Sequence, residues 1–146
     1  MHRLFGTLFL ALILVACQSS PEDASPSPDA AASAPSPRVF FVEPTDGSTV
    51  ASPVTFTMGA EGVDIVPAGQ QQDNSGHLHI LINAPFIDPG VVIPADDQHV
   101  HFGTGTTEAE LDLPPGTHTI RLQLGDWAHR GLEGDGFRDE ITLTVE

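Results

Sequence analysis

From Arg38 onward, turn-forming residues divide the chain into apolar runs that are too short for helices of ordinary length. Glycine, proline and aspartate gather between the runs, as in Pro44-Thr45-Asp46-Gly47, Pro114-Pro115-Gly116 and Gly134-Asp135-Gly136. These residues favour turns, because glycine permits positive φ and proline fixes φ. The runs themselves are rich in β-branched and aromatic residues, and none shows a convincing helical period. The pattern predicts a succession of short β-strands.

Several of these runs alternate apolar and polar residues, as half-buried strands do. In residues 117–124, Ile120, Leu122 and Leu124 fall on one face and polar residues fall on the other. The candidate strands are 39–43, 54–60, 63–66, 77–83, 99–102, 108–113, 118–124 and 139–145. Seven or eight strands in one domain of this size predict an all-β fold, an immunoglobulin-like antiparallel β-sandwich. A jelly roll has similar local patterning and is the alternative.

The first residues have the layout of a secretory signal peptide. Arg3 is followed by an uncharged apolar run that ends before Gln18, short of the roughly 20 residues that a spanning helix needs. Leu14-Val15-Ala16-Cys17 resembles a bacterial lipobox, in which a cysteine receives diacylglycerol before cleavage on its amino side. We therefore expect Cys17 to be the lipidated first residue of the mature protein, anchored to a membrane by several acyl chains, palmitate among them. An ordinary cleavage site with a chance cysteine is the alternative.

A linker separates this anchor from the folded part. After Cys17, the chain to Pro37 is rich in proline, serine and alanine and has no aromatic residue. Such a composition cannot bury a core. We expect a signal peptide at 1–16, a linker at 17–37 and a single β-sandwich domain at 38–146. The domain is then extracytoplasmic at the cell envelope. In a cell with two membranes, Gln18 after the cysteine favours the outer membrane facing the periplasm over the inner membrane.

The charge of the chain limits its partners. It has 20 acidic and 5 basic residues, a net charge of −15 and no lysine. Nucleic acid is therefore excluded as a partner. A negative field is compatible with cation capture. With Cys17 lipidated, the domain contains no thiol, so disulfides and thiolate metal sites are excluded too.

Two His-x-His units, His77-Leu78-His79 and His99-Val100-His101, contain four of the seven histidines. Residues i and i+2 of a strand share a face, so each unit presents both rings on one side. If the two strands are neighbours, four imidazoles converge on a patch small enough for one ion. Neutral imidazole suits copper(II) and zinc, whereas copper(I) is less favoured because Met58 is the one thioether of the mature chain.

The loop around Trp127 is the best candidate for closing over this patch, because loops carry function more often than packing. It contains His129 and Asp126. Each ligating ring needs an acceptor for its second nitrogen, and Asp126, Asp97 and Asp96 are available. We expect His118 to be structural. The predicted metal ligands are His77, His79, His99, His101 and His129, supported by Asp126 and Asp97.

These features predict a lipid-anchored binding protein that holds copper(II) or zinc. No nucleophile motif, phosphate-binding glycine loop or recognisable carboxylate pair is present, so we expect no enzyme and no catalytic residues. The alternative is an interaction module at the cell envelope that docks a protein partner or a cell-wall component, with the histidines as a hydrogen-bonded structural cluster. A pH-responsive patch and a site for a small polar ligand are also open.

Several segments resemble one family, the uncharacterised domain-of-unknown-function family 4399. The segments are 38–47, Gly76-His77-Leu78-His79 with the apolar residues after it, His99-Val100-His101-Phe102-Gly103, and 107–116. The resemblance implies a small secreted or lipid-anchored β-domain and carries no established activity. In the late loop, family members often have Gly-Asp-x-x-His-x-Pro-His. Here Gly125, Asp126 and His129 fit that pattern, while Gly131 and Leu132 replace its last two residues.

Overall fold

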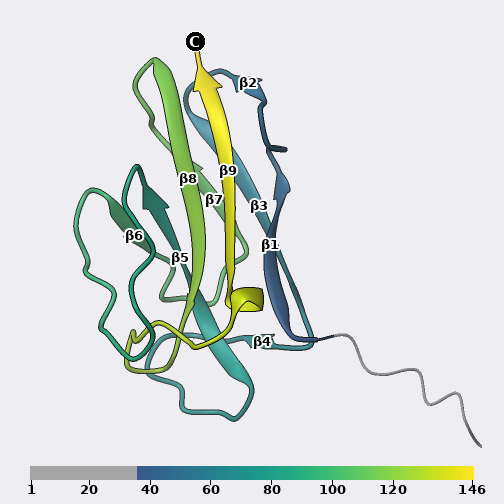
Figure 1. Cartoon of the computed structure of the whole chain (residues 1–146), viewed down its shortest axis with the longest axis vertical. Helices are drawn as coiled ribbons and strands as arrows, with labels where there is room; N and C mark the ends of the chain where they lie inside the picture. Colours follow the sequence, from purple (N-terminus) through teal and green to yellow (C-terminus); the bar gives the residue numbers. More distant parts are fainter. Residues whose placement is uncertain (1–35) are drawn as a thin grey trace, which may run out of the picture. The chain divides into compact units, whose positions relative to one another are not determined.

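Residues 36–146 are described by the computed structural model, and they form nine strands and one short 3-10 helix (Figure 1). The signal peptide, Cys17 and the linker up to residue 35 lie outside the described residues. The strands are β1 Arg38–Glu43, β2 Thr49–Val50, β3 Val54–Glu61, β4 Asp64–Ile65, β5 Ser75–Ile82, β6 His99–His101, β7 Glu108–Leu111, β8 Gly116–Gly125 and β9 Arg138–Val145, and the helix η1 is Asp135–Phe137. In this part of the chain, no helix has the length and hydropathy to cross a membrane.

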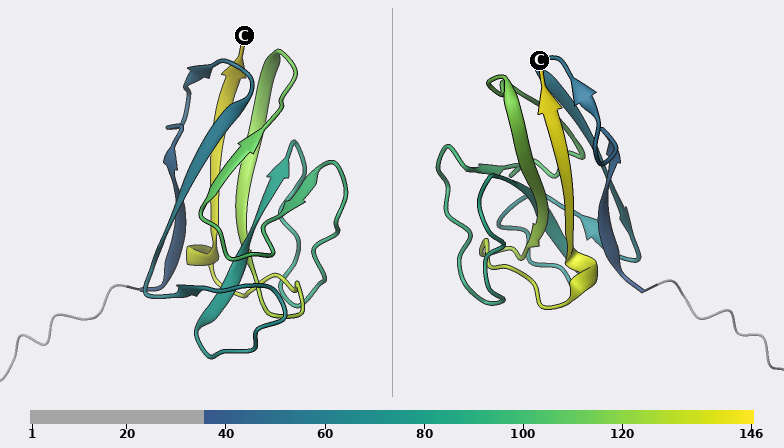
Figure 2. Two further views of the ribbon diagram at one scale, coloured as in Figure 1. Left: turned by 180° about the vertical axis from the view of Figure 1, so that it is seen from behind. Right: turned by 45° about the horizontal axis from the view of Figure 1, so that its top comes forward.

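The strands belong to two sheets, seen from two further sides in Figure 2. The smaller sheet has the order β1-β3-β7, and the larger has the order β2-β9-β8-β5-β4, with β6 also paired to β5. The pairings are antiparallel except for β2 with β9 and β4 with β5, which are parallel. The all-β prediction is confirmed, and each expected strand is present with shifted ends. The ninth strand, β2, was missed because two residues cannot display an alternation. The immunoglobulin-like arrangement stays a prediction.

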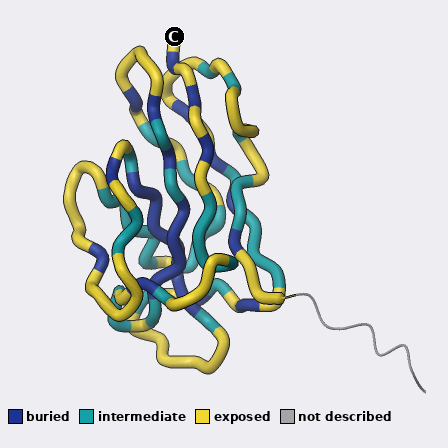
Figure 3. The backbone as a smooth tube through the Cα atoms, in the orientation of Figure 1, coloured by how far each residue is buried: buried dark blue, intermediate teal, exposed yellow. Residues whose placement is uncertain are grey.

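The hydrophobic core contains side chains from both sheets. Phe56 of β3, Ile80 of β5 and Leu122 of β8 are all fully buried within it. Figure 3 shows buried residues running along the middle of β5 and β8. Burying each such side chain stabilises the fold by about 1.5–3 kcal/mol. The alternation in β8 therefore identified the core-facing side of the larger sheet correctly.

The second face of the larger sheet is covered by residues 83–98, between β5 and β6, which we call the covering segment. Gln123 of β8, which is fully buried, attaches this segment to the sheet. The Gln123 Nε2 atom donates to the Ile87 carbonyl at 2.7 Å, and its Oε1 atom accepts from the Ile87 N–H at 2.9 Å. Arg138 of β9 donates to the same carbonyl at 2.9 Å. Strand β5 is consequently buried on both faces, which alternation alone does not predict.

Replacing Gln123 tests this attachment. Gln123→Leu keeps the bulk of the side chain but leaves the partly buried Ile87 N–H without its acceptor, so we expect a loss of about 1–3 kcal/mol in the free energy of unfolding. Urea denaturation measures it, with Gln70→Leu at an exposed position as the matched control, expected to stay within about 0.5 kcal/mol. Equal effects of the two substitutions would contradict the attachment.

Candidate metal centre

Strands β5 and β6 bring the two His-x-His units together. In this antiparallel pair, His79 lies opposite His101, and Leu81 lies opposite His99. The intervening residues of β5, Leu78 and Ile80, belong to the hydrophobic core, so the histidines lie on the other face, beneath the covering segment. The prediction that the two units occupy neighbouring strands is confirmed.

Four imidazole rings form a compact group, which we call the histidine cluster: His77, His79, His101 and His129. The ring centroids are 4.7–5.0 Å apart for every pair except His79 and His129, which are 6.1 Å apart. One nitrogen atom each of His77, His101 and His129 lies within 4.8 Å of the others. Metal–nitrogen bonds are about 2.0–2.1 Å long, so small ring rotations bring three such atoms around one ion.

The cluster is buried, and most of its nitrogen atoms lack partners. The side chains of His77 and His79 are 0% and 1% exposed, whereas His101 and His129 are partly exposed. Within residues 36–146, both ring nitrogens of His77 and His79 and the Nε2 atom of His101 are buried without a hydrogen bond. An unsatisfied buried polar group costs about 1–3 kcal/mol. Within residues 36–146, the partners that a hydrogen-bonded structural cluster requires are thus not supplied to these five atoms.

Burial also affects the protonation of His77, His79 and His101. It is the main cause that lowers the pKa of His77 to about 4, reinforced by His101 and His129 and opposed by Asp126. Burial and the neighbouring histidines lower the pKa of His79 to about 3, and burial lowers the pKa of His101 as well. At neutral pH, His77 and His79 are consequently uncharged, which is the form that coordinates a metal ion.

His129 reaches the cluster from the loop after β8, whose shape depends on Asp126. The Oδ1 atom of Asp126 accepts from the N–H groups of Ala128 and Arg130, both at 2.8 Å. His129 has a φ of 63°, in the left-handed region that non-glycine residues seldom adopt. Its carbonyl accepts from the Ile93 N–H of the covering segment at 2.8 Å. Asp126 thus positions His129 through the backbone of the loop. This differs from the role predicted from the sequence, in which Asp126 accepts a hydrogen bond from a ring nitrogen.

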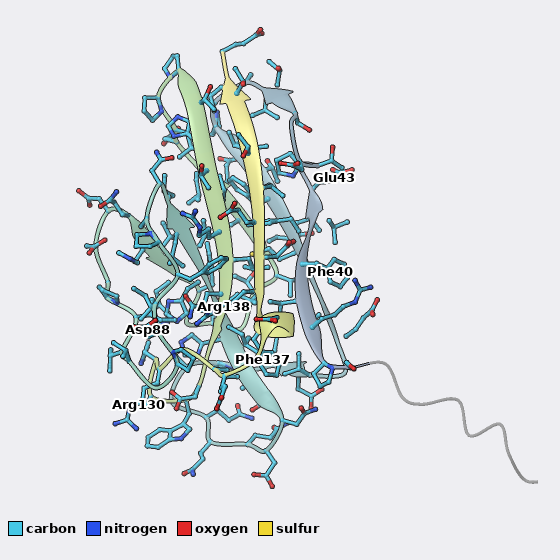
Figure 4. All side chains as sticks on the ribbon, in the orientation of Figure 1. Phe40, Glu43, Asp88, Arg130, Phe137 and Arg138 are labelled. Carbon is cyan, nitrogen blue, oxygen red and sulfur yellow. The ribbon has the colours of Figure 1, made fainter. Side chains whose placement is uncertain are left out.

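The covering segment and the loop after β8 lie together at one end of the molecule, where Figure 4 labels Asp88 and Arg130. Val92 forms a bridge with Arg130, and the Gly90 N–H donates to the Gly131 carbonyl at 2.9 Å. The histidine cluster is therefore enclosed by the sheet and by two loops that are paired with each other.

Two other residues predicted to take part in metal binding, His99 and Asp97, lie outside the histidine cluster. The His99 Nδ1 atom is 2.7 Å from an oxygen of Asp96, and its buried Nε2 atom has no partner in the described part of the chain. His99 is not in the group of nitrogens that lie within 4.8 Å of one another. Asp97 is exposed, and the described hydrogen bonds give it no histidine. Of the two neighbouring aspartates that the sequence offered as acceptors, Asp96 therefore orients His99 and Asp97 does not.

His118 lies elsewhere and has ordinary partners. Its Nδ1 atom is 3.0 Å from the Asn83 amide nitrogen, and its Nε2 atom is 2.8 Å from the Pro114 carbonyl oxygen. Both ring nitrogens are thus satisfied, in agreement with the structural role expected for this residue.

Two glycines leave the space that the rings occupy. A Cβ atom at Gly103 would overlap the His101 ring and lie 2.9 Å from its Nε2 atom. A Cβ atom at Gly125 would lie 2.9 Å from the His79 Nε2 atom. Sequence reasoning did not identify either requirement, although Gly103 follows the second His-x-His unit closely.

The lowered pKa values predict that acid destabilises the metal-free protein. Unfolded histidines bind protons below about pH 6.5, whereas His77 and His79 in the folded state do so only near pH 4 and 3. Stability is therefore complete above pH 6.5 and falls toward pH 4, by about 1.4 kcal/mol per pH unit for each such histidine. Urea unfolding of metal-free protein at several pH values measures this slope. His79→Gln removes one titrating group and should make the slope shallower by that amount; an unchanged slope would refute the assignment.

Comparison with known proteins gives a family and little else. Curated proteins give no match. A solved structure, the endo-beta-1,4-mannanase from Thermotoga petrophila, is 18% identical with a TM-score of 0.44, and the alignment covers 75% of this chain and 20% of that one. The chain thus spans about a fifth of that protein's length. The model of a domain of unknown function (DUF4399) matches residues 56–146, more than half of the chain, and the chain therefore belongs to this family.

Proposed function

We propose that this protein binds one divalent transition-metal ion, copper(II) or zinc, through His77, His101 and His129, with His79 as the fourth ligand. The observation that carries the proposal is the group of three imidazoles, in which His77 is buried and uncharged and neither of its ring nitrogens has a hydrogen-bond partner within residues 36–146. An ion at their centre would bind one nitrogen of each ring.

The donor set favours these two ions. Imidazole suits zinc and copper(II), whereas copper(I) prefers sulfur. Met58, the one methionine of the described domain, lies in the hydrophobic core and not among the histidines. The His79 ring centroid is 4.8 Å from that of His77 and 5.0 Å from that of His101, close enough for a modest shift to complete a tetrahedral set.

We propose binding rather than catalysis. A catalytic zinc site keeps one position open for water, while four protein ligands close the sphere of a tetrahedral ion. His77 and His79 lie inside the protein, and His101 and His129 are partly exposed, so the ion would enter on the side of the last two. His99 is set aside as a ligand and stays beside the cluster.

We also propose that the chain is a lipoprotein of the cell envelope, anchored through Cys17. The support is the apolar run followed by Leu14-Val15-Ala16-Cys17, together with the proline-rich linker. In a cell with two membranes we favour the outer membrane, with the domain in the periplasm. The net charge of −15 favours cations over nucleic acid near its surface.

Metal titration tests the binding proposal. Protein stripped by a chelator should bind copper(II) or zinc with a Kd below about 10 μM, measured by calorimetry. Because Trp127 is the one tryptophan of the chain and lies two residues from His129, copper(II) should also quench its fluorescence, and zinc should not. His101→Ala and His129→Ala should weaken binding beyond the roughly 10–100-fold that loss of a supporting group causes.

His118→Gln is the matched control, since it removes an imidazole outside the cluster whose two nitrogens have partners. This variant should bind the metal with nearly the affinity of the natural chain. If the stripped protein binds neither ion, or if the cluster variants bind as well as the control, the metal proposal fails. The interaction module is then the better description.

The glycine beside His101 gives a second test. Gly103→Ala adds a methyl group that displaces the His101 ring, so we expect metal affinity to fall by about 10-fold or more, as it does when ligand orientation is lost. Thr104→Ala, at the exposed neighbouring position, is the control and should leave affinity unchanged. Calorimetry with zinc compares the two; a Gly103→Ala protein that binds normally would show that the His101 ring is not a ligand.

A further inference from the structure

A cavity with no histidine in its lining lies against the loop that carries His129. We call it the Trp127 cavity; its volume is about 340 Å³. It is lined by residues 71–75, which lead into β5, and by residues of and after the loop that follows β8. Val63, Leu132 and Phe137 are the aliphatic and phenyl side chains of the lining, and Phe137 is labelled in Figure 4. This volume is at the lower end of the range for small-molecule sites, about 300–1,000 Å³.

The walls of the Trp127 cavity are held in place. The Gly69 N–H donates to the Trp127 carbonyl at 3.1 Å, which joins the two loops. The Ser75 hydroxyl donates to the Gln72 carbonyl at 2.7 Å. Asp126 uses its Oδ1 atom for the turn of its own loop, and the described hydrogen bonds leave its Oδ2 atom available as an acceptor. The cavity is thus formed before a ligand arrives, which reduces the entropy cost of binding.

Its lining combines a flat aromatic surface with hydrogen-bonding groups. The Trp127 side chain is 46% exposed, unusual for so large an apolar group. Beside it lie the amide of Gln71 and the carboxylates of Asp73 and Asp126. Indole packs against apolar ring faces, while amides and carboxylates bond hydroxyl groups. A ligand that fits both has one apolar face and a rim of hydroxyls.

The charge of the cavity lining limits the class of ligand further. No arginine or histidine is among the residues that line the cavity, and the chain carries a net charge of −15. An anion would be repelled by the two carboxylates. An ammonium ion would satisfy the carboxylates but offers only donors, and the Gln71 amide also needs an acceptor for its N–H groups. Hydroxyls donate and accept, so they suit the whole lining.

We propose that the Trp127 cavity is a binding site for a neutral saccharide, with one sugar ring packed on Trp127 and its hydroxyls bonded by Gln71, Asp73 and Asp126. This site is separate from the metal proposal and does not depend on it. It gives the protein a means of recognising a glycan through the same loop that supplies His129.

Fluorescence of Trp127 tests the proposal, because it is the chain's one tryptophan and it lines this cavity. The metal-stripped protein is titrated with cellobiose and with N,N′-diacetylchitobiose. A saturable change in the emission of Trp127 with at least one of them, at a Kd below about 10 mM, is the expected result. A disaccharide containing glucuronic acid should bind at least about 10-fold more weakly, a difference of about 1.4 kcal/mol.

Variants separate this site from nonspecific binding. By calorimetry, Trp127→Ala should abolish binding of the disaccharide, and Asp73→Asn should weaken it several-fold. Val92→Ala, at an exposed apolar position on the neighbouring loop, should bind it normally. Urea unfolding should give Trp127→Ala a cooperative transition like that of the natural chain, which shows that the variant is folded without reference to metal binding.

Three results would overturn the proposal. They are no response to either neutral disaccharide, binding that Trp127→Ala leaves unchanged, and a preference for tetramethylammonium over both disaccharides, which would mark a cation site.

Discussion

The contact between Gln123 and the backbone of Ile87 is the interaction on which the rest of the structure depends. It attaches the segment 83–98 to a sheet face that an ordinary sandwich would leave in water. Through this contact, β5 has hydrophobic neighbours on one side and a covering loop on the other. The histidines of β5 would otherwise be solvated side chains with ordinary protonation. Their lowered pKa values follow from burial beneath this segment, which Gln123 helps to hold in place although it has no part in the cluster itself.

The histidine cluster lowers the stability of the folded protein when no ion is bound. The rings of His77 and His79 give up hydration without gaining hydrogen bonds, and the backbone of His129 is held in a left-handed conformation. Such costs concentrate at functional sites, where the surrounding structure enforces them. Strand pairing in the sheet holds His77 and His101 in place, and the pairing of the two loops holds His129. The cost is the physical reason to expect a ligand there.

Local pattern predicted the parts of this arrangement that depend on strand geometry. The alternation in β8 and the spacing within each His-x-His unit determine which side chains share a face, because the strand repeat is two residues. The pairing of His79 with His101 needed only that the strands be neighbours. Gln123, Gly103 and the choice of Asp96 over Asp97 depend on how loops far apart in sequence pack, and no local period encodes that. Their only trace in the sequence is residue type.

The proposed ligands come from three separate parts of the chain: β5, β6 and the loop after β8. An ion bound by all of them would close two long loops of polypeptide at once and restrict the unfolded chain, much as a cross-link does. A domain without thiols would thereby gain a reversible substitute for a disulfide. Its resistance to unfolding would then follow the supply of metal in its surroundings, and its lifetime would report on that supply.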